Sequence, residues 1–337
     1  MLFQDVVLDE EKQEVKQFLA TFKLDYEGDI DQTILLKEAN KIIATASTSH
    51  NVIKCVAIDP TYQGQNLLAT LMSEMIKRLA SRGIHHYFVY TKEEQAHLFK
   101  ALGLKQIVLT MEVALFEGGD TIQNKLQQLK ETYKISKKPK AAVVVNANPM
   151  TKGHFHLIKT VAEQHEAVLV FVVSEERSIF PFEVRFKIVK DACKELENVT
   201  VLPSLEYLVS YATFPKYFMK QESKIREEHA LIDVLIFKEY YMKIFNIQHR
   251  YVGEEPISPM TEMYNHTMRK YLNQRFHIIP RKTLNNVPIS ASTVRKLLKK
   301  NGLDAISPYV VKETFDFLQT SQGQKIIESI KNHDARH

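Results

Sequence analysis

The sequence has few cysteines and no long apolar run, and these two absences exclude several classes of protein. Only Cys55 and Cys193 occur among 337 residues, far apart and without a CxxC spacing. They indicate neither a disulfide framework nor a zinc cage, so we expect a reducing compartment, the cytoplasm. No apolar stretch reaches the ~18 residues of a membrane-spanning helix, and the first residues lack the pattern of a secretory signal. We therefore expect no membrane partner.

A strong charge of one sign is also missing. The 45 basic and 40 acidic residues give a formal net charge of +5, and both signs are mixed along the chain. This balance gives little support for nucleic-acid binding, and an anionic small molecule such as a nucleotide suits it equally well. We expect no nucleic-acid partner.

The length and composition predict two folded domains. A domain commonly holds roughly 100 to 200 residues, and this chain has 337, of which 45% are hydrophobic. The polar, basic segment from Gln123 to Lys140 separates two regions with different patterns. We therefore expect a first domain over residues 1–125, a basic linker over 126–140 and a second domain over 141–337.

The first region has the pattern of an α+β domain. Two β-rich runs fill Lys41 to Asp59, and HHYFVYT and QIVLTMEVALF are later strand candidates. Between them, apolar residues from Leu67 to Leu79 recur at helical spacing, and this pattern stops at Gly83.

The second region alternates apolar runs with stretches long enough for helices. The runs are AAVVVNA, AVLVFVV, NVTVLP, IDVLIF, HRYVG and FHIIP. Continuous apolar runs are typical of strands that are buried on both faces. The pattern predicts an α/β, Rossmann-like domain with a doubly wound parallel sheet, closed by helices between Val310 and Ile330.

The turn after the first of these runs is a candidate phosphate site. The sequence VVVNANPMTKGHFHLIK places Pro149 and Gly153 in the turn, and His154 and His156 in the first turn of the next helix. Ligands of open α/β sheets bind beyond the carboxyl ends of strands, and the N-terminus of a helix attracts phosphate. A histidine there can donate to a phosphate oxygen whose charge grows in the transition state.

Two other interpretations of these histidines remain open. They can be structural residues at a helix start, a common role for histidine. A metal site needs more ligands, and His165 is the only other nearby candidate, without a cysteine or an acidic cluster. We expect no metal site in the protein itself.

A second constellation lies in NVPISASTVRKLLKKNG, from Asn286 to Gly302. Ser290 or Ser292 can cap a helix that ends at Gly302, which by itself requires no function. Together with Thr293 they offer three hydroxyls, and Arg295 leans back toward the same helix end. Such a group can hold the outer phosphates of a triphosphate.

These residues resemble the motifs of a known superfamily. PMTKGH resembles the (H/T)xGH motif, and ISASTVR resembles the ISSTxxR motif, of the nucleotidyltransferases, which transfer AMP or CMP from a nucleoside triphosphate and release pyrophosphate. The resemblance implies ATP as substrate, with Thr151 and His154 at its α-phosphate. It implies that Ser292, Thr293 and Arg295 hold the outer phosphates. The other implied nucleotide-binding residues are Asn148, Gly153, His156, Gly253, Glu254 and Ser290.

A third motif suggests a substrate contact. SIFPFEVRFKIVKDA resembles the superfamily's stretch after the second strand, in which an arginine like Arg185 follows an aromatic turn. Pairing with residues three or four positions away on a helix surface is the alternative role of this arginine.

The first region has a resemblance of its own. AIDPTYQGQNLLATLM and HLFKALGLKQI resemble the pyrophosphate-binding turn and the closing helix of GNAT-type acetyltransferases. Gln63 and Gly64 match the turn and are candidates for binding a CoA-like group. Asn66 and Leu68 replace later glycines, and we expect Leu68 to obstruct close approach by a ligand.

The whole chain, a GNAT-like domain followed by a (H/T)xGH domain, resembles the citrate lyase ligase family. LEYLVSYATFPKYFMK resembles that family's ATFP segment, and Ser210 and Thr213 within it are substrate candidates. The resemblance implies the reaction of ATP, acetate and a carrier thiol to AMP, pyrophosphate and an acetyl thioester, with Mg²⁺ on the phosphates. The implied partner is the citrate lyase acyl carrier subunit, whose thiol lies on a prosthetic group derived from dephospho-CoA.

Two other functions stay open at this point. One is a nucleotidyltransferase that adenylylates or cytidylylates a phosphorylated small metabolite. The other is a binding or regulatory protein with two decayed catalytic domains, against which the intact Thr151, Gly153, His154 and Arg295 argue.

Overall fold

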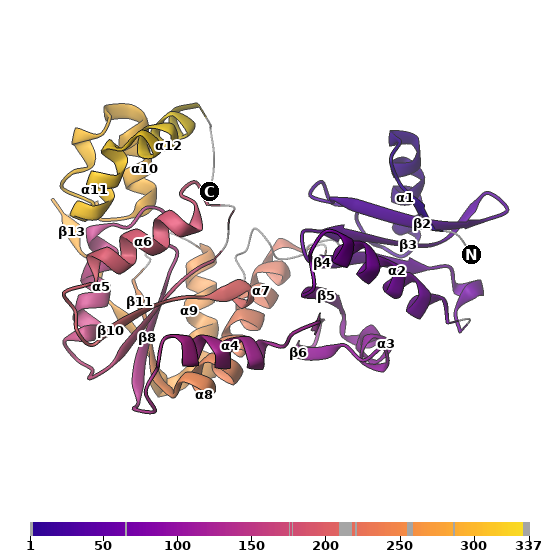
Figure 1. Cartoon of the computed structure of the whole chain (residues 1–337), viewed down its shortest axis with the longest axis horizontal. Helices are drawn as coiled ribbons and strands as arrows, with labels where there is room; N and C mark the ends of the chain where they lie inside the picture. Colours follow the sequence, from indigo (N-terminus) through magenta and orange to yellow (C-terminus); the bar gives the residue numbers. More distant parts are fainter. Residues whose placement is uncertain are drawn as a thin grey trace. The chain divides into compact units, whose positions relative to one another are not determined.

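The computed structural model describes residues 3–332 except 65, 175, 177, 209–217, 220, 255–258 and 286. The chain divides into two compact units (Figure 1). The first unit contains residues 1–125 and 213–232, and the second contains 126–212 and 233–337. Among the described residues, no helix is both long and apolar enough to cross a membrane.

In the described part of the first unit, seven strands form one sheet in the order β1-β2-β3-β4-β5-β7-β6. β4 and β5 are parallel and pair only at their first residues, Val52 with Phe88 and Ile53 with Val89, whereas the other neighbours are antiparallel. The strands are β1 (Gln4–Asp5), β2 (Gln32–Glu38), β3 (Lys41–Ser49), β4 (Val52–Ile58), β5 (Tyr87–Lys92), β6 (Lys105–Leu109) and β7 (Val113–Gly118).

Helices cover both faces of this sheet. Alternate residues of β2 point to opposite faces, so Ile34 packs in the cluster with α2 while Leu35 packs in the cluster with α1. The helices of this part are α1 (Asp9–Thr21), α2 (Leu67–Ser81), α3 (Ala96–Ala101) and α4 (Ile122–Thr132), the last of which crosses the boundary between the units. The expected α+β pattern of the first region is confirmed.

The second unit is built on a parallel sheet in the order β10-β9-β8-β11-β12. The chain moves outward from β8 through β9 to β10 and then returns to the other side of β8 with β11. The carboxyl ends of β8 and β11 therefore flank the point where strand order reverses, which is where such sheets bind ligands. The strands are β8 (Lys140–Val145), β9 (Val168–Val172), β10 (Val199–Pro203), β11 (Ile247–Gly253) and β12 (Phe276–Ile279), followed by the hairpin of β13 (Thr283–Leu284) and β14 (Val287–Pro288).

Two sets of helices cover this sheet. Ala141, Val143 and Val145 face the cluster that contains α5 and α6, while Phe171 on β9 faces the rings of Phe237, Tyr241 and Phe245. The described helices after β8 are α5 (Lys152–Ala162), α6 (Phe182–Ala192), α7 (Glu222–Ile236), α8 (Met242–Phe245), α9 (Pro259–Leu272), α10 (Ala291–Asn301), α11 (Lys312–Gln319) and α12 (Ser321–Asn332). α7 belongs to the first unit up to Ile232 and to the second from Asp233. The expected doubly wound α/β architecture and its closing helices are confirmed.

One predicted strand is wrong. IDVLIF lies at the end of α7 and in a π-helical turn over Phe237–Tyr241. Ile232, Val234, Ile236 and Phe237 are all buried. A buried helix segment and a buried strand both appear as apolar runs, so this run could not be distinguished by its composition alone.

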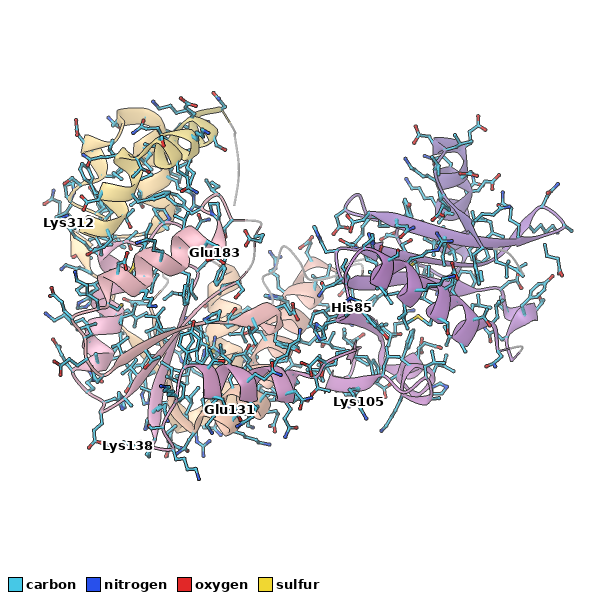
Figure 2. The ribbon with its side chains drawn as sticks, viewed as in Figure 1. His85, Lys105, Glu131, Lys138, Glu183 and Lys312 are labelled. Atoms are coloured by element: carbon cyan, nitrogen blue, oxygen red, sulfur yellow. The ribbon has the colours of Figure 1, made fainter. Side chains whose placement is uncertain are left out.

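The first part of the segment expected to be a linker, up to Thr132, is helical. Leu126 and Leu129 on α4 are buried at a spacing of three residues, which attaches the helix to the protein. Figure 2 shows Glu131 on this helix and Lys138 in the loop ahead of β8. The first unit also takes residues 213–232, from the middle of the second expected domain.

Candidate functional site

The turn after β8 ends in an N-cap formed by Thr151. Its hydroxyl accepts a hydrogen bond from the backbone N–H of His154 at 3.3 Å, and its own backbone N–H donates to His154 Nδ1 at 3.1 Å. The backbone N–H of Lys152 donates to the carbonyl of Tyr309 at 2.8 Å. Protein acceptors therefore engage two amides of the first helical turn, and the histidine side chain is fixed in place.

This geometry sets the protonation of His154. Because a backbone N–H donates to Nδ1, the neutral ring carries its proton on Nε2. Burial lowers the pKa of His154 to about 4, and the positive charge of Arg281 adds to the effect. The side chain is still partly exposed. Near neutral pH it is therefore a neutral, oriented N–H donor.

The start of α10 brings three hydroxyls together. Ser290 is the N-cap, and its Oγ accepts from the backbone N–H of Thr293 at 3.1 Å. The same Oγ lies 2.9 Å from Ser292 Oγ and 2.8 Å from Thr293 Oγ1. The capping role and the clustering of hydroxyls, which the sequence left as alternatives, are both present.

The two motifs meet through a glycine. A Cβ added to Gly153 would lie 2.9 Å from the carbonyl oxygen of Ile289, the residue before the α10 N-cap. Any side chain at 153 would push the starts of α5 and α10 apart. Thr151 and His154 are therefore held next to the hydroxyl cluster, as a site for an extended phosphate chain requires.

Arg295 and Asn148 connect the loops around this site. Arg295 donates through Nη1 to the carbonyl of Asn148, and burial lowers the pKa of Arg295. The side chain of Asn148 accepts from the backbone N–H of Phe180 at 3.0 Å. Arg295 and Asn148 therefore also have structural roles, because they tie the turn after β8 to α10 and to the loop before α6.

Arg185 has a structural position that sequence analysis did not predict. Only 1% of it is exposed. Its guanidinium donates to the carbonyls of Phe180, Asn146 and Val173 at 2.7 to 2.9 Å, and to Asn146 Oδ1 at 2.9 Å. It fastens the loops beyond β8 and β9, and this burial supports neither a direct substrate contact nor pairing on a helix surface.

The remaining candidates of the second unit are placed as follows. Gly253 ends β11, and the backbone N–H of Glu254 donates to the carbonyl of Ile279 at 2.8 Å. These two residues lie at the carboxyl edge of the sheet, level with the end of β12. Ser210 and Thr213 lie outside the described residues.

The two histidines of the turn are separated in the fold. His156 lines a cavity of about 580 Å³ together with Lys152 and Lys282, and His154 is not among the residues that line it. His165 lies 2.8 Å from the hydroxyl of Tyr251, in a different group of rings. Within the described ranges, no three or more His, Cys, Asp or Glu residues form a group that could hold a metal ion.

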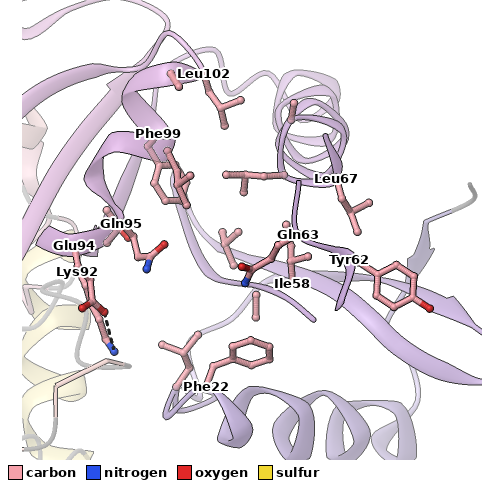
Figure 3. Close-up of a pocket in the computed structure, with 18 of the residues that line it drawn as sticks. Phe22, Ile58, Tyr62, Gln63, Leu67, Lys92, Glu94, Gln95, Phe99 and Leu102 are labelled. Carbon is pink, nitrogen blue, oxygen red and sulfur yellow. Dashed lines mark ion pairs between the residues drawn. The ribbon is translucent and has the colours of Figure 1, made fainter. Parts of the chain in front are cut away.

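A larger cavity, of about 700 Å³, lies in the first unit where β4 and β5 diverge. Figure 3 shows Phe22, Gln63 and Phe99 around it. Gly64 and Asn66 also line it, both with positive φ, so Asn66 keeps the turn geometry although it replaces a glycine. Leu68 is part of the lining, and so is Phe218, which comes from the ATFP segment.

Some residues that shape the candidate phosphate site carry no sequence signal of their own. Thr314 donates to the carbonyl of Met150 at 2.8 Å, and Val310 forms an isolated bridge with Thr151. Both come from the C-terminal tail, which the sequence identifies only as apolar helices. Their contacts with the turn are set by long-range packing.

Comparisons with known proteins agree with this arrangement. The family model "Citrate lyase ligase C-terminal domain" matches residues 140–318, and the "Acetyltransferase (GNAT) family" model matches residues 3–104. The chain is 36% identical to the citrate (pro-3S)-lyase ligase of Escherichia coli, over 91% of this chain and 90% of that protein. It is 31% identical to the ligase of the same name from Klebsiella pneumoniae, over 91% of this chain and 92% of that protein. A Haemophilus influenzae ligase of this name is 33% identical, over 83% and 86% of the two chains.

Proposed function

The chain belongs to the citrate lyase ligase family, and from this premise we propose that it is an ATP-dependent ligase that acetylates the acyl carrier subunit of citrate lyase. In the proposed reaction, acetate is first activated as acetyl-AMP with release of pyrophosphate. The thiol of a prosthetic group derived from dephospho-CoA then takes the acetyl group and releases AMP.

The chemistry explains why this reaction needs no protein nucleophile. Acetate is a poor electrophile because its leaving group would be oxide. Attack of its carboxylate on the α-phosphate creates AMP as a better leaving group. Catalysis then depends on holding the reactants and on stabilising the charge that moves to pyrophosphate.

The observation that carries the proposal is the close approach of the two motifs at Gly153 and Ile289. It supports a single site in which His154 Nε2–H donates to the α-phosphate, while Ser292, Thr293 and Arg295 hold the outer phosphates. Thr151 is a positioning residue for His154. Magnesium enters as part of the MgATP substrate, since Mg²⁺ commonly binds through substrate phosphates and water with few protein ligands.

The first prediction concerns the first half-reaction. We expect exchange of labelled pyrophosphate into ATP to require acetate, because pyrophosphate can return to ATP only through acetyl-AMP. The measurement is the exchange rate with acetate, without it, and with propionate as a matched carboxylate. Exchange that is independent of any carboxylate would reject the ligase reaction.

We further propose that the cavity of the first unit receives the thiol-bearing arm of the carrier. Its volume of about 700 Å³ lies within the range of small-molecule sites. Gln63 and Gly64, in the turn before α2, line the cavity. Apolar surface for an extended arm comes from Leu67, Leu98 and Phe99. Lys92, paired with Glu94 at 4.0 Å, supplies the positive charge in the lining.

The second prediction separates this cavity from the ATP site. Ala69 lines the cavity near the start of α2, and Ala69→Trp should fill part of it. We expect transfer of acetyl to the carrier to fall at least ~10-fold, because the arm loses its place. ATP–pyrophosphate exchange, which does not use the carrier, should stay unchanged.

Thr70→Trp is the matched control for this experiment. Thr70 is the next residue on α2, is exposed and is not part of the lining. Equal transfer rates for both variants would remove the cavity from the reaction.

Both cysteines are free and buried, which suits a reducing compartment, and we propose the cytoplasm as the site of action.

A further inference from the structure

Arg281 lies at the carboxyl edge of the second sheet, two residues beyond β12. β12 is parallel to β11, and its last residue, Ile279, is level with Gly253. The backbone N–H of Glu254 donates to the carbonyl of Ile279. The chain therefore reaches Arg281 directly from the edge at which the nucleotide site is proposed.

The hairpin of β13 and β14 returns the chain to the start of α10. The backbone N–H of Ile289 donates to the carbonyl of Lys282 at 3.0 Å. This bond places residues 281 and 282 beside the residue that precedes the Ser290 N-cap. The carbonyl of the same Ile289 is the group against which Gly153 packs. Arg281, the start of α10 and the start of α5 therefore converge at Ile289.

The charge of Arg281 acts on His154. Its positive charge is the second cause, after burial, of the low pKa of that imidazole. The guanidinium of Arg281 is partly exposed. Arg295, on α10, is also partly exposed, and it donates to the carbonyl of Asn148, so part of its hydrogen-bonding capacity serves the protein.

We propose that Arg281 is a further phosphate-binding residue, whose guanidinium contacts the triphosphate of ATP beside His154 and stabilises the charge that passes to pyrophosphate. This inference rests on the proposed ATP site. A guanidinium is suited to the role because it is always charged and can donate two parallel hydrogen bonds to a phosphate. His154 is a neutral donor, so Arg281 would supply the positive charge that the histidine lacks.

The experiment compares Arg281→Gln, Arg281→Lys and the control Arg275→Gln. Arg275 is exposed in the turn before β12, at the opposite end of the same strand. We expect Arg281→Gln to weaken MgATP binding, measured by calorimetry without acetate, at least ~10-fold, and to slow exchange by ~10². Arg281→Lys should lie between Arg281→Gln and the wild type, and Arg275→Gln should match the wild type.

A second readout tests the position of Arg281 directly. Without its positive charge, the pKa of His154 should move upward toward its ordinary value, which NMR titration of the imidazole can follow. If Arg281 had only a structural role away from His154, a folded Arg281→Gln variant would leave this pKa unchanged. If Arg281→Gln does not fold, the Lys variant decides, because it keeps the charge but loses the paired hydrogen bonds.

The outcomes separate this inference from the proposed function. Wild-type affinity for MgATP in Arg281→Gln, or in the Lys variant if only that folds, would overturn the role of Arg281 even if acetate-dependent exchange is observed. Weakened MgATP binding in a protein whose exchange ignores acetate would support Arg281 and reject the ligase reaction.

Discussion

Replacing His154 by alanine should slow acetate-dependent ATP–pyrophosphate exchange by about 10² or more, the scale expected when one transition-state donor is removed. The reason is geometric. The backbone N–H of Thr151 fixes the ring and leaves the proton on Nε2, directed away from the turn. Exchange assays at saturating ATP and acetate would measure the loss. Near-normal exchange in this variant would move the site away from the turn.

His156→Ala is the matched control, since His156 lies two residues beyond His154 on α5 and lines a cavity that His154 does not line. We expect its exchange rate to stay within a few fold of the wild type. A His154→Gln variant, which keeps a side-chain N–H, should recover part of the activity lost in His154→Ala. Equal loss in the alanine and glutamine variants would argue against the donor role.

The pKa of His154 supplies an independent check through stability. The pKa of His154 is lowered to about 4 in the folded protein, whereas its ordinary value is about 6.5. Below pH ~6.5 the unfolded state therefore binds the proton more readily than the folded state. The stabilisation is complete above pH ~6.5 and is lost as the pH falls toward 4, by at most about 3 kcal/mol. Urea unfolding at several pH values should show this fall in the wild type and a weaker one in His154→Ala.

Replacing Arg185 by methionine should lower the free energy of unfolding of the second unit by about 4 kcal/mol, because buried acceptors lose a charged donor. The guanidinium donates to three carbonyls and to Asn146 Oδ1. Methionine fills similar space but cannot donate to any of them. Urea denaturation followed by circular dichroism would measure the change.

Lys187→Met is the control on the same helix. Lys187 is mostly exposed, and its ion pair with Asp191 joins two surface residues one turn apart. Such a surface ion pair contributes little to stability, so we expect the free energy of unfolding to change by no more than about 0.5 kcal/mol. If Arg185→Met were as stable as this control, the loops beyond β8 and β9 would not depend on the buried guanidinium.

Several elements could be read from the sequence because their signals are local. The Ser290 N-cap and the apolar strands β8 and β9 each depend on residues within one turn or one strand. IDVLIF was misassigned because burial in a helix and burial in a strand produce the same apolar run. The helix in the linker was missed because its apolar pattern is short, with Leu126 and Leu129 as its buried apolar residues beyond position 125.

The roles of the arginines show where local patterns are insufficient. The sequence around Arg185 is typical of a surface helix. Its hydrogen-bond acceptors nevertheless lie up to 39 positions away, beyond the ends of two strands. Arg281 gave no signal, because its place beside His154 depends on the hairpin that follows it. The guanidinium of Arg185 is fixed by carbonyls that only the folded sheet edge brings near.

The sequence by itself determined the two motifs, the alternation of strands and helices, and the hydroxyls and histidine suited to a triphosphate. Helix capping and hydrophobic periodicity depend on residues that are close in the sequence, so the sequence alone can predict them. The tertiary structure decided that Gly153 packs against Ile289, that Arg185 is buried, and that Phe218 joins the cavity of the first unit. Each of these contacts joins residues far apart in the chain, so packing of the whole unit selects them.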